Sequence, residues 1–238
     1  MLKVLAAPHV PVRWLHAPRR PVRGVSDLAD QAGVSPASAS RFLSALEAGG
    51  HVAQVDGAVR LARVEARLEA WRSASQRPNE ERLARFLLPA PEPARRLREV
   101  LAAHSRRSQA LSGEDPEDRS GARAGSPGRR VCLALFSACR ELDVSFVRGA
   151  PIHIYAEDLS NGFLDELELH PVEHRAEADL IVRRPRFPES VFRACVLVED
   201  VPVADILQCW FDVSFHSARG NEQAEEIAKL LRPMEWSR

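Results

Sequence analysis

Residues 25–61, VSDLADQAGVSPASASRFLSALEAGGHVAQVDGAVRL, decide the fold expected for the first part of this chain. Ser26 can cap a short helix that closes at Gly33, and Ser35 can cap a second helix whose first residue is a proline. The glycine pair that begins at Gly49 permits a left-handed C-cap for this second helix. The stretch therefore predicts two short helices joined by a tight turn.

A hairpin follows the second helix. Residues 51–61 contain two short alternating segments around Asp56 and Gly57, a residue pair typical of a two-residue hairpin turn. The order helix, turn, helix, hairpin is that of a winged helix-turn-helix, which inserts its second helix into the major groove of DNA. We therefore expect double-stranded DNA as the partner. The alternative is a small winged domain used only for protein contact.

The second helix has one apolar face and one face of small residues. Leu43, Leu46 and Phe42 recur at helical spacing, so they should face a core together with Leu28 and Val34. The residues expected to contact DNA lie on the opposite face or on the hairpin; they are Ser35, Ala37, Ser38, Ser40, Arg41, Ser44 and Arg60. Small side chains allow this helix to approach the bases closely.

Two arginines supply the long donors of this surface. Arg41 can form a forked pair with a guanine, or it can clamp a phosphate, and the sequence leaves both roles open. Arg60 on the hairpin can reach an adjacent phosphate or the minor groove.

The charge of the chain is balanced overall but divided along its length. Lys and Arg number 33 and so do Asp and Glu, yet residues 1–130 hold 22 basic against 14 acidic residues, and residues 131–238 hold 11 against 19. A basic first half suits contact with phosphates. Arginine-rich helices that are simply solvated would give the same division.

Composition indicates an ordinary globular protein, with 45% hydrophobic and 28% charged residues. No apolar run is long enough to span a membrane, and residues 1–24 lack the features of a signal peptide. The four cysteines form no CxxC pair, so we expect buried structural thiols in a cytoplasmic protein rather than a metal or redox site. Cys132 and Cys139 should both face a core from one apolar helix.

The chain is expected to be α+β, with a winged helix-turn-helix over residues 1–75, a helical connector and polar loop over 76–129, and a mixed α/β domain over 130–238. Further helices are expected over residues 62–75, 79–88, 94–107, 129–143, 200–215 and 221–231. A long polar loop is expected over residues 112–129. Strands are expected within residues 145–149, 151–158, 162–172, 178–185 and 194–203.

Three stretches together resemble a known family. They are DLADQAGVSPASASRFLSALEAGG (27–50), SFVRGAPIHIY (145–155) and VADILQCWFDVSFHSARGNEQAEEI (203–227). They resemble the AbiEi-type regulators, the antitoxin-like partners of type IV toxin–antitoxin and phage-defence loci. The resemblance implies a degenerate nucleotidyltransferase-like second domain and repression of the protein's own operon at an inverted repeat. For some members it also implies a partner toxin, although no residue here can be tied to toxin neutralisation.

The second half lacks the pattern of a working nucleotidyltransferase. Such an enzyme needs a Gly-Ser turn followed by two carboxylates one residue apart, and none is present. Glu166 and Glu168 would share one face of a strand, where they could hold a metal or simply form an acidic edge. His170 and His174 would share a helical face, but Pro171 argues against a helix. We therefore expect no catalytic residues, no metal and no cofactor.

These observations favour a DNA-binding transcriptional regulator, a repressor, that is not an enzyme. Two copies should read an inverted repeat, either as a homodimer or by cooperative loading, because one winged domain buries only about 600–1,000 Å² of protein on DNA. The alternatives are an interaction module whose acidic half captures a basic toxin or effector, and, less favoured, an enzyme acting on nucleotides.

Overall fold

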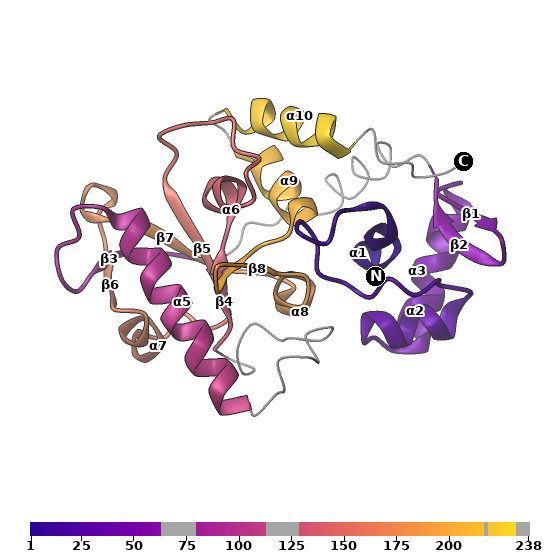
Figure 1. Ribbon diagram of the computed structural model, residues 1–238, viewed down its shortest axis with the longest axis horizontal. Coiled ribbons are helices and arrows are strands. Elements are labelled where there is room, and N and C mark those ends of the chain that lie inside the picture. Colours follow the sequence, from indigo (N-terminus) through magenta and orange to yellow (C-terminus); the bar gives the residue numbers. More distant parts are fainter. Residues whose placement is uncertain (63–79, 113–128, 217–218, 232–238) are drawn as a thin grey trace. The chain divides into compact units, whose positions relative to one another are not determined.

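The structure is a computed structural model that describes residues 1–62, 80–112, 129–216 and 219–231 (Figure 1). The chain forms two compact units, one of residues 1–76 with 228–238 and one of residues 77–227. Most of the helix expected over residues 62–75, and most of the loop expected over 112–129, lie outside the described residues.

The first unit contains a helix-turn-helix with a hairpin wing, as the sequence predicts. Helices α2 (Val25–Ala32) and α3 (Pro36–Ala48) pack against each other. Strands β1 (Val52–Val55) and β2 (Ala58–Leu61) form the antiparallel wing, with Val55 opposite Ala58.

Local sequence signals explain most of these boundaries. Gly33 ends α2 in the left-handed conformation with φ 61°, and the wing turns at Asp56 and Gly57, both of which have positive φ. The Ser35 hydroxyl accepts a hydrogen bond of 3.2 Å from the Ser38 N–H, which confirms the cap expected for α3.

The cap expected at Ser26 is wrong, because α2 begins one residue earlier, at Val25. Gly24 is the N-cap residue and offers no side chain. The Asp27 carboxylate instead accepts a hydrogen bond of 2.9 Å from the Arg23 N–H, so an acid in the first turn reaches back to a backbone donor ahead of the helix.

The segment before α2 is part of the same unit. It forms α1 (Leu2–Ala6) and a 3₁₀ turn, η1 (Ala7–His9), and α1 contacts both α2 and β2. The Arg19 guanidinium donates hydrogen bonds to the carbonyls of Ala7, Val10 (2.8 Å) and Leu15 (3.2 Å). One arginine therefore satisfies three backbone acceptors of an irregular segment.

The second unit is built on a mixed seven-stranded sheet of order β6-β3-β7-β5-β4-β9-β8. The β5–β7 and β4–β9 pairs are parallel, and the other pairs are antiparallel. The strands are β3 (Glu80–Phe86), β4 (Val131–Leu133), β5 (Ile152–Ala156), β6 (Leu169–Val172), β7 (Leu180–Arg184), β8 (Val196–Val198) and β9 (Val201–Val203).

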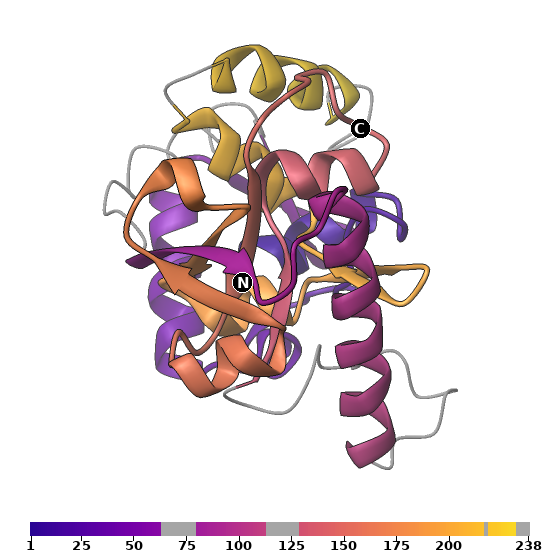
Figure 2. The same ribbon diagram turned by 90° about the vertical axis from the view of Figure 1, so that its left-hand side faces the viewer.

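Helices cover both faces of this sheet, and Figure 2 shows α5 and α9 on opposite sides. The helical elements of this part of the chain are α5 (Pro93–Ser112), α6 (Leu135–Glu141), α7 (Asn161–Glu166), η3 (Arg175–Glu177), α8 (Pro188–Phe192), α9 (Ile206–Ser214) and α10 (Gly220–Leu231). Between α9 and the sheet, the buried Tyr155 hydroxyl donates to Asp212 (2.9 Å), and the Gln208 amide donates to the same carboxylate oxygen (2.9 Å).

The helix expected over residues 79–88 is wrong, because this stretch contains strand β3. Ala84 and Phe86 are buried while Arg85 between them is exposed, which is the alternation of a strand with one covered face. β3 lies between β6 and β7 and pairs antiparallel with both. The expected connector, residues 76–129, thus contributes β3 and α5 to the larger unit.

The single helix expected over residues 129–143 is also wrong. Residues Val131–Leu133 form β4, and α6 begins at Leu135, whose φ of 46° marks the break between them. Cys132 therefore lies on a strand and Cys139 on a helix, although both are buried. All four cysteines are buried and none of them forms a disulfide, as expected of structural thiols.

Two of the expected strands are wrong in whole or in part. Residues 145–149 contain no strand; the buried Gln223 side chain holds them by accepting from the N–H groups of Phe146 (2.7 Å) and Val147 (3.1 Å). Residues 162–172 contain a strand only at their end, β6. Their first half belongs instead to α7, whose N-cap Ser160 accepts from the Phe163 N–H (3.3 Å).

Candidate nucleic-acid interface

The packing of α3 fixes which of its faces is open. Ala39, Leu43 and Leu46 are buried, and they follow each other at the spacing of one helical stripe. Phe42 and Val34 are only half-buried, so they flank the core rather than fill it. The remaining face of α3 carries the exposed residues Ser40, Arg41 and Ser44.

The first turn of α3 presents a pair of serines that hold each other. Ser35 and Ala37 are exposed and Ser38 is half-buried. The Ser35 hydroxyl donates to the Ser38 hydroxyl at 3.0 Å while it accepts from the Ser38 N–H. Both hydroxyls therefore already serve the helix cap, and each keeps only part of its hydrogen-bonding capacity for a ligand.

The side chain of Arg41 is unpaired in the part of the chain that the structure describes. Within residues 1–62 and the other described ranges, no hydrogen bond or ion pair engages its exposed side chain. Arg20 is different, because its guanidinium pairs with Asp30 at 3.1 Å on the same unit. All five N–H donors of Arg41 are consequently open to a nucleic acid.

Arg60 is half-buried on β2, opposite Ala53 of β1, and α3 contacts β1. Its Nε is buried and has no hydrogen-bond partner among the described atoms. The seven residues predicted to contact DNA thus fall on one helix and on the wing beside it. Residues 1–62 hold seven Lys and Arg residues against four Asp and Glu residues, which favours phosphate contact.

One further candidate, Arg23, was not predicted from the sequence. Its side chain is exposed, and it stands directly before the Gly24 N-cap of α2. In the part of the chain that the structure describes, only its backbone N–H has a partner, Asp27. The signal that could have identified it is its position beside the N-terminus of the first helix of the motif, where phosphates are commonly bound.

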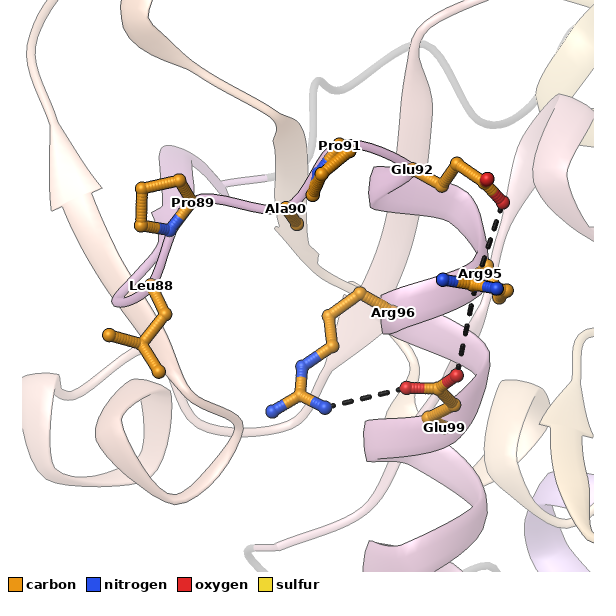
Figure 3. A pocket seen from close by; sticks show the side chains of 8 residues that line it. All are labelled: Leu88, Pro89, Ala90, Pro91, Glu92, Arg95, Arg96 and Glu99. Atoms are coloured by element: carbon orange, nitrogen blue, oxygen red, sulfur yellow. Dashed lines mark hydrogen bonds and ion pairs between the residues drawn. The ribbon is translucent and has the colours of Figure 1, made fainter.

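The second unit has an open pocket of about 340 Å³ where β3 leads into α5 (Figure 3). It is lined by Leu88, Pro89, Ala90, Pro91, Glu92, Arg95, Arg96 and Glu99. Both of its arginines are paired with acids: Arg95 with Glu92 at 3.5 Å, and Arg96 with Glu99 at 3.4 Å and with Glu168. These contacts raise the pKa of Arg96. The pocket therefore offers no unpaired cation to an anionic ligand.

The acids considered as metal ligands lie apart in structure. Glu166 ends α7 and pairs with Arg129 at 2.8 Å, and Glu168 follows with a positive φ of 58° and pairs with Arg96. They do not share a strand face as expected. Across the described ranges, no group of three or more His, Cys, Asp or Glu side chains could hold a metal ion.

The strongest charge cluster of the second unit is internal. The side chain of Arg130 is 2% exposed and forms ion pairs with Glu157 at 2.7 Å and Glu189 at 2.5 Å. The hydrogen bonds that Arg130 donates to Glu157 and Glu189 raise the pKa of Arg130, and the bond to Glu189 lowers the pKa of that carboxyl group. This cluster ties α8 to the sheet and is already satisfied.

None of the described helices combines the length and the apolar character that crossing a bilayer requires.

Comparison with known proteins finds one match, which lies within the first unit. Residues 13–56 match the IclR helix-turn-helix domain, a segment that contains α2, α3 and β1. The match does not name the AbiEi-type regulators expected from the sequence. No curated protein matches the chain, and no solved structure matches it. A helix-turn-helix domain of this type suggests that the protein is a DNA-binding transcriptional regulator.

Proposed function

We propose that the protein is a transcriptional repressor, without enzymatic activity, that binds an inverted-repeat operator by placing α3 in the major groove. The observation that carries this proposal is the open face of α3, where Arg41 is exposed and has no partner among the described residues. The match of residues 13–56 to a helix-turn-helix domain supports it.

Contacts outside α3 would fix its position on the duplex. Arg60 on the wing and Arg23 before α2 supply further charges for phosphates. One such unit buries too little surface for tight specific binding, so we propose that two copies occupy the two halves of the operator, as a dimer or by cooperative loading.

A second candidate function is capture of a basic partner protein, such as a toxin, by the second half of the chain. It is favoured by the 19 acidic against 11 basic residues of residues 131–238. The two functions are compatible, because an antitoxin-like repressor would bind DNA through its first unit and a toxin through its second.

A mobility-shift assay tests the repressor proposal, with the duplex upstream of the protein's own gene as probe. If Arg41 reads a base, Arg41→Ala should weaken binding by about 1–3 kcal/mol, or about 5- to 150-fold. If Arg41 clamps a phosphate, the variant should weaken binding to every duplex and reduce the salt dependence by one charge. Transcription from this promoter in vitro should fall as the wild-type protein is added.

Arg95→Ala is the matched control, because it removes one exposed arginine from α5 of the other unit. It should leave binding nearly unchanged. An equal loss for the two variants would contradict the assignment to α3, and so would unchanged affinity and salt dependence in Arg41→Ala.

A further inference from the structure

We infer that the direct base readout of α3 rests on one side chain. Arg41 fixes one guanine in each half-site. The other residues of the open face let the helix come close to the bases but form no further base-specific hydrogen bond. This inference rests on the proposed function, since it concerns how the same surface selects its DNA.

The direction of Arg41 follows from helical geometry. At about 100° per residue, Ala39 and Leu43 each lie roughly 160° around the axis from Arg41, and Leu46 lies roughly 140° away. These three are the buried residues of α3. Arg41 therefore projects away from the core, along the line on which a groove would approach.

The side chains around Arg41 are all short. By the same rotation, the five residues within about 60° of it are Ala37, Ser38, Ser44, Ala45 and Ala48. Bidentate recognition of a base requires Arg, Lys, Asn or Gln, and Arg41 is the one such residue on α3. The other charged side chain of α3, Glu47, lies roughly 120° around the helix from Arg41.

The hydroxyls on this face discriminate little. A serine hydroxyl can donate to or accept from several base edges, so Ser44 adds affinity without fixing a base. Ser38 is further limited because the Ser35 hydroxyl donates to it at 3.0 Å. The alanine methyls can contact thymine methyls, which gives a preference rather than a requirement.

The tip of the wing adds no reader of a base. It consists of Asp56 and Gly57, and a carboxylate there is repelled by the phosphates that border the minor groove. The exposed amide of the wing, Gln54, stands back from the tip, opposite Val59. Arg60 stands back from the tip, opposite Ala53, where a phosphate contact is the simplest use of its charge.

One arginine per half-site cannot supply the whole preference of a regulator for its operator. One good bidentate pair discriminates against the wrong base by about 5- to 150-fold. Specific regulators typically prefer their operator by about 10³- to 10⁷-fold over other DNA. Two copies with one guanine each cover only the lower part of this range, so DNA shape and deformability must supply the remainder.

Selection from a random-sequence duplex library tests this inference with the full chain. The wild-type protein should enrich duplexes with one strongly fixed G·C pair per half-site, beside weaker A·T-rich positions. Arg41→Ala should lose that fixed position while it still retains duplex, and Arg41→Lys should keep the charge with a weaker guanine preference. Ser44→Asn should add a preference for an adenine.

Arg95→Ala, in the other unit, should leave the selected motif unchanged. The inference is overturned if Arg41→Ala still selects the guanine, or if the wild-type motif has two or more equally fixed pairs per half-site. Failure of the wild-type protein to retain any duplex would overturn the proposed function itself, whereas retention without a fixed guanine overturns the inference alone.

Discussion

The buried side chain of His153 makes the stability of the second unit dependent on pH. The side chain of His153 is 1% exposed, its Nδ1 lies 2.9 Å from the Pro151 carbonyl, and its ring packs edge-on near His216. Burial lowers the pKa of His153 to about 3, and the positive charge of Arg183 contributes in the same direction. His153 is therefore neutral in the folded protein under ordinary conditions.

Acidification should destabilise the fold through His153. Between pH 6.5 and about 3 the unfolded chain binds a proton at this residue and the folded chain does not, so the free energy of unfolding falls as pH falls, by at most about 1.4 kcal/mol per pH unit. Urea unfolding at pH 7 and pH 5 should show a smaller difference for His153→Gln than for the wild-type protein. His170→Gln, at an exposed site on β6, is the control and should keep the wild-type difference.

If His153→Gln loses as much free energy of unfolding between pH 7 and pH 5 as the wild-type protein, His153 does not titrate in this way. His104 on α5 does not affect this comparison. Its pKa is also lowered, chiefly by burial, but His104 is present in the wild-type protein and in both variants.

At the scale of elements, the cap of α3 has a measurable role. The Ser35 hydroxyl satisfies the Ser38 N–H, which would otherwise be an unpaired donor of the first turn. Ser35→Ala should lower the free energy of unfolding by about 1 kcal/mol, and Ser35→Gly should lower it by only a few tenths. Chemical denaturation followed by circular dichroism measures both.

Ser26→Ala is the matched control, because Ser26 lies inside α2 and caps nothing. Alanine is the better helix former, so this change should leave stability unchanged or slightly higher. A loss equal to that of Ser35→Ala would show that Ser26, and not Gly24 with Asp27, begins α2.

The elements that could be predicted from sequence are those whose causes are local. Ser35, Gly33 and the Asp56–Gly57 turn act on residues within four positions, and the helical period alone places Arg41 opposite the core. The start of α2 was missed because Ser26 is of a residue type that commonly caps helices, whereas the helix begins at Val25 and Asp27 accepts from the Arg23 N–H.

The strand β3 could not be predicted in this way. Its sequence, EERLARF, favours a helix by intrinsic propensity. Its conformation is decided by pairing with β6 and β7, which lie far along the chain. The same is true of residues 145–149, whose backbone is held by the distant Gln223. Within the candidate interface, the hydrogen bond between the hydroxyls of Ser35 and Ser38 could not be predicted from the sequence either.

At the scale of the whole molecule, the expected unit of function is a pair of chains. A duplex with both half-sites should bind two copies, and disruption of one half-site should weaken binding of both if they cooperate. Sedimentation of the complex gives its mass, and a titration gives the affinity. The expectation is contradicted if the saturated complex holds one chain per duplex, and if the affinity is the same for duplexes with one and with two half-sites.

The position of β3 in the sheet has a consequence for how the chain folds during synthesis. Glu80–Phe86 leaves the ribosome long before its two neighbours, Leu169–Val172 and Leu180–Arg184, have been made. The helix-turn-helix can form from adjacent residues at once, whereas the large sheet must wait for contacts of high sequence separation. Until then an unpaired strand is exposed to other nascent chains, and the larger unit is the part that a chaperone would need to protect.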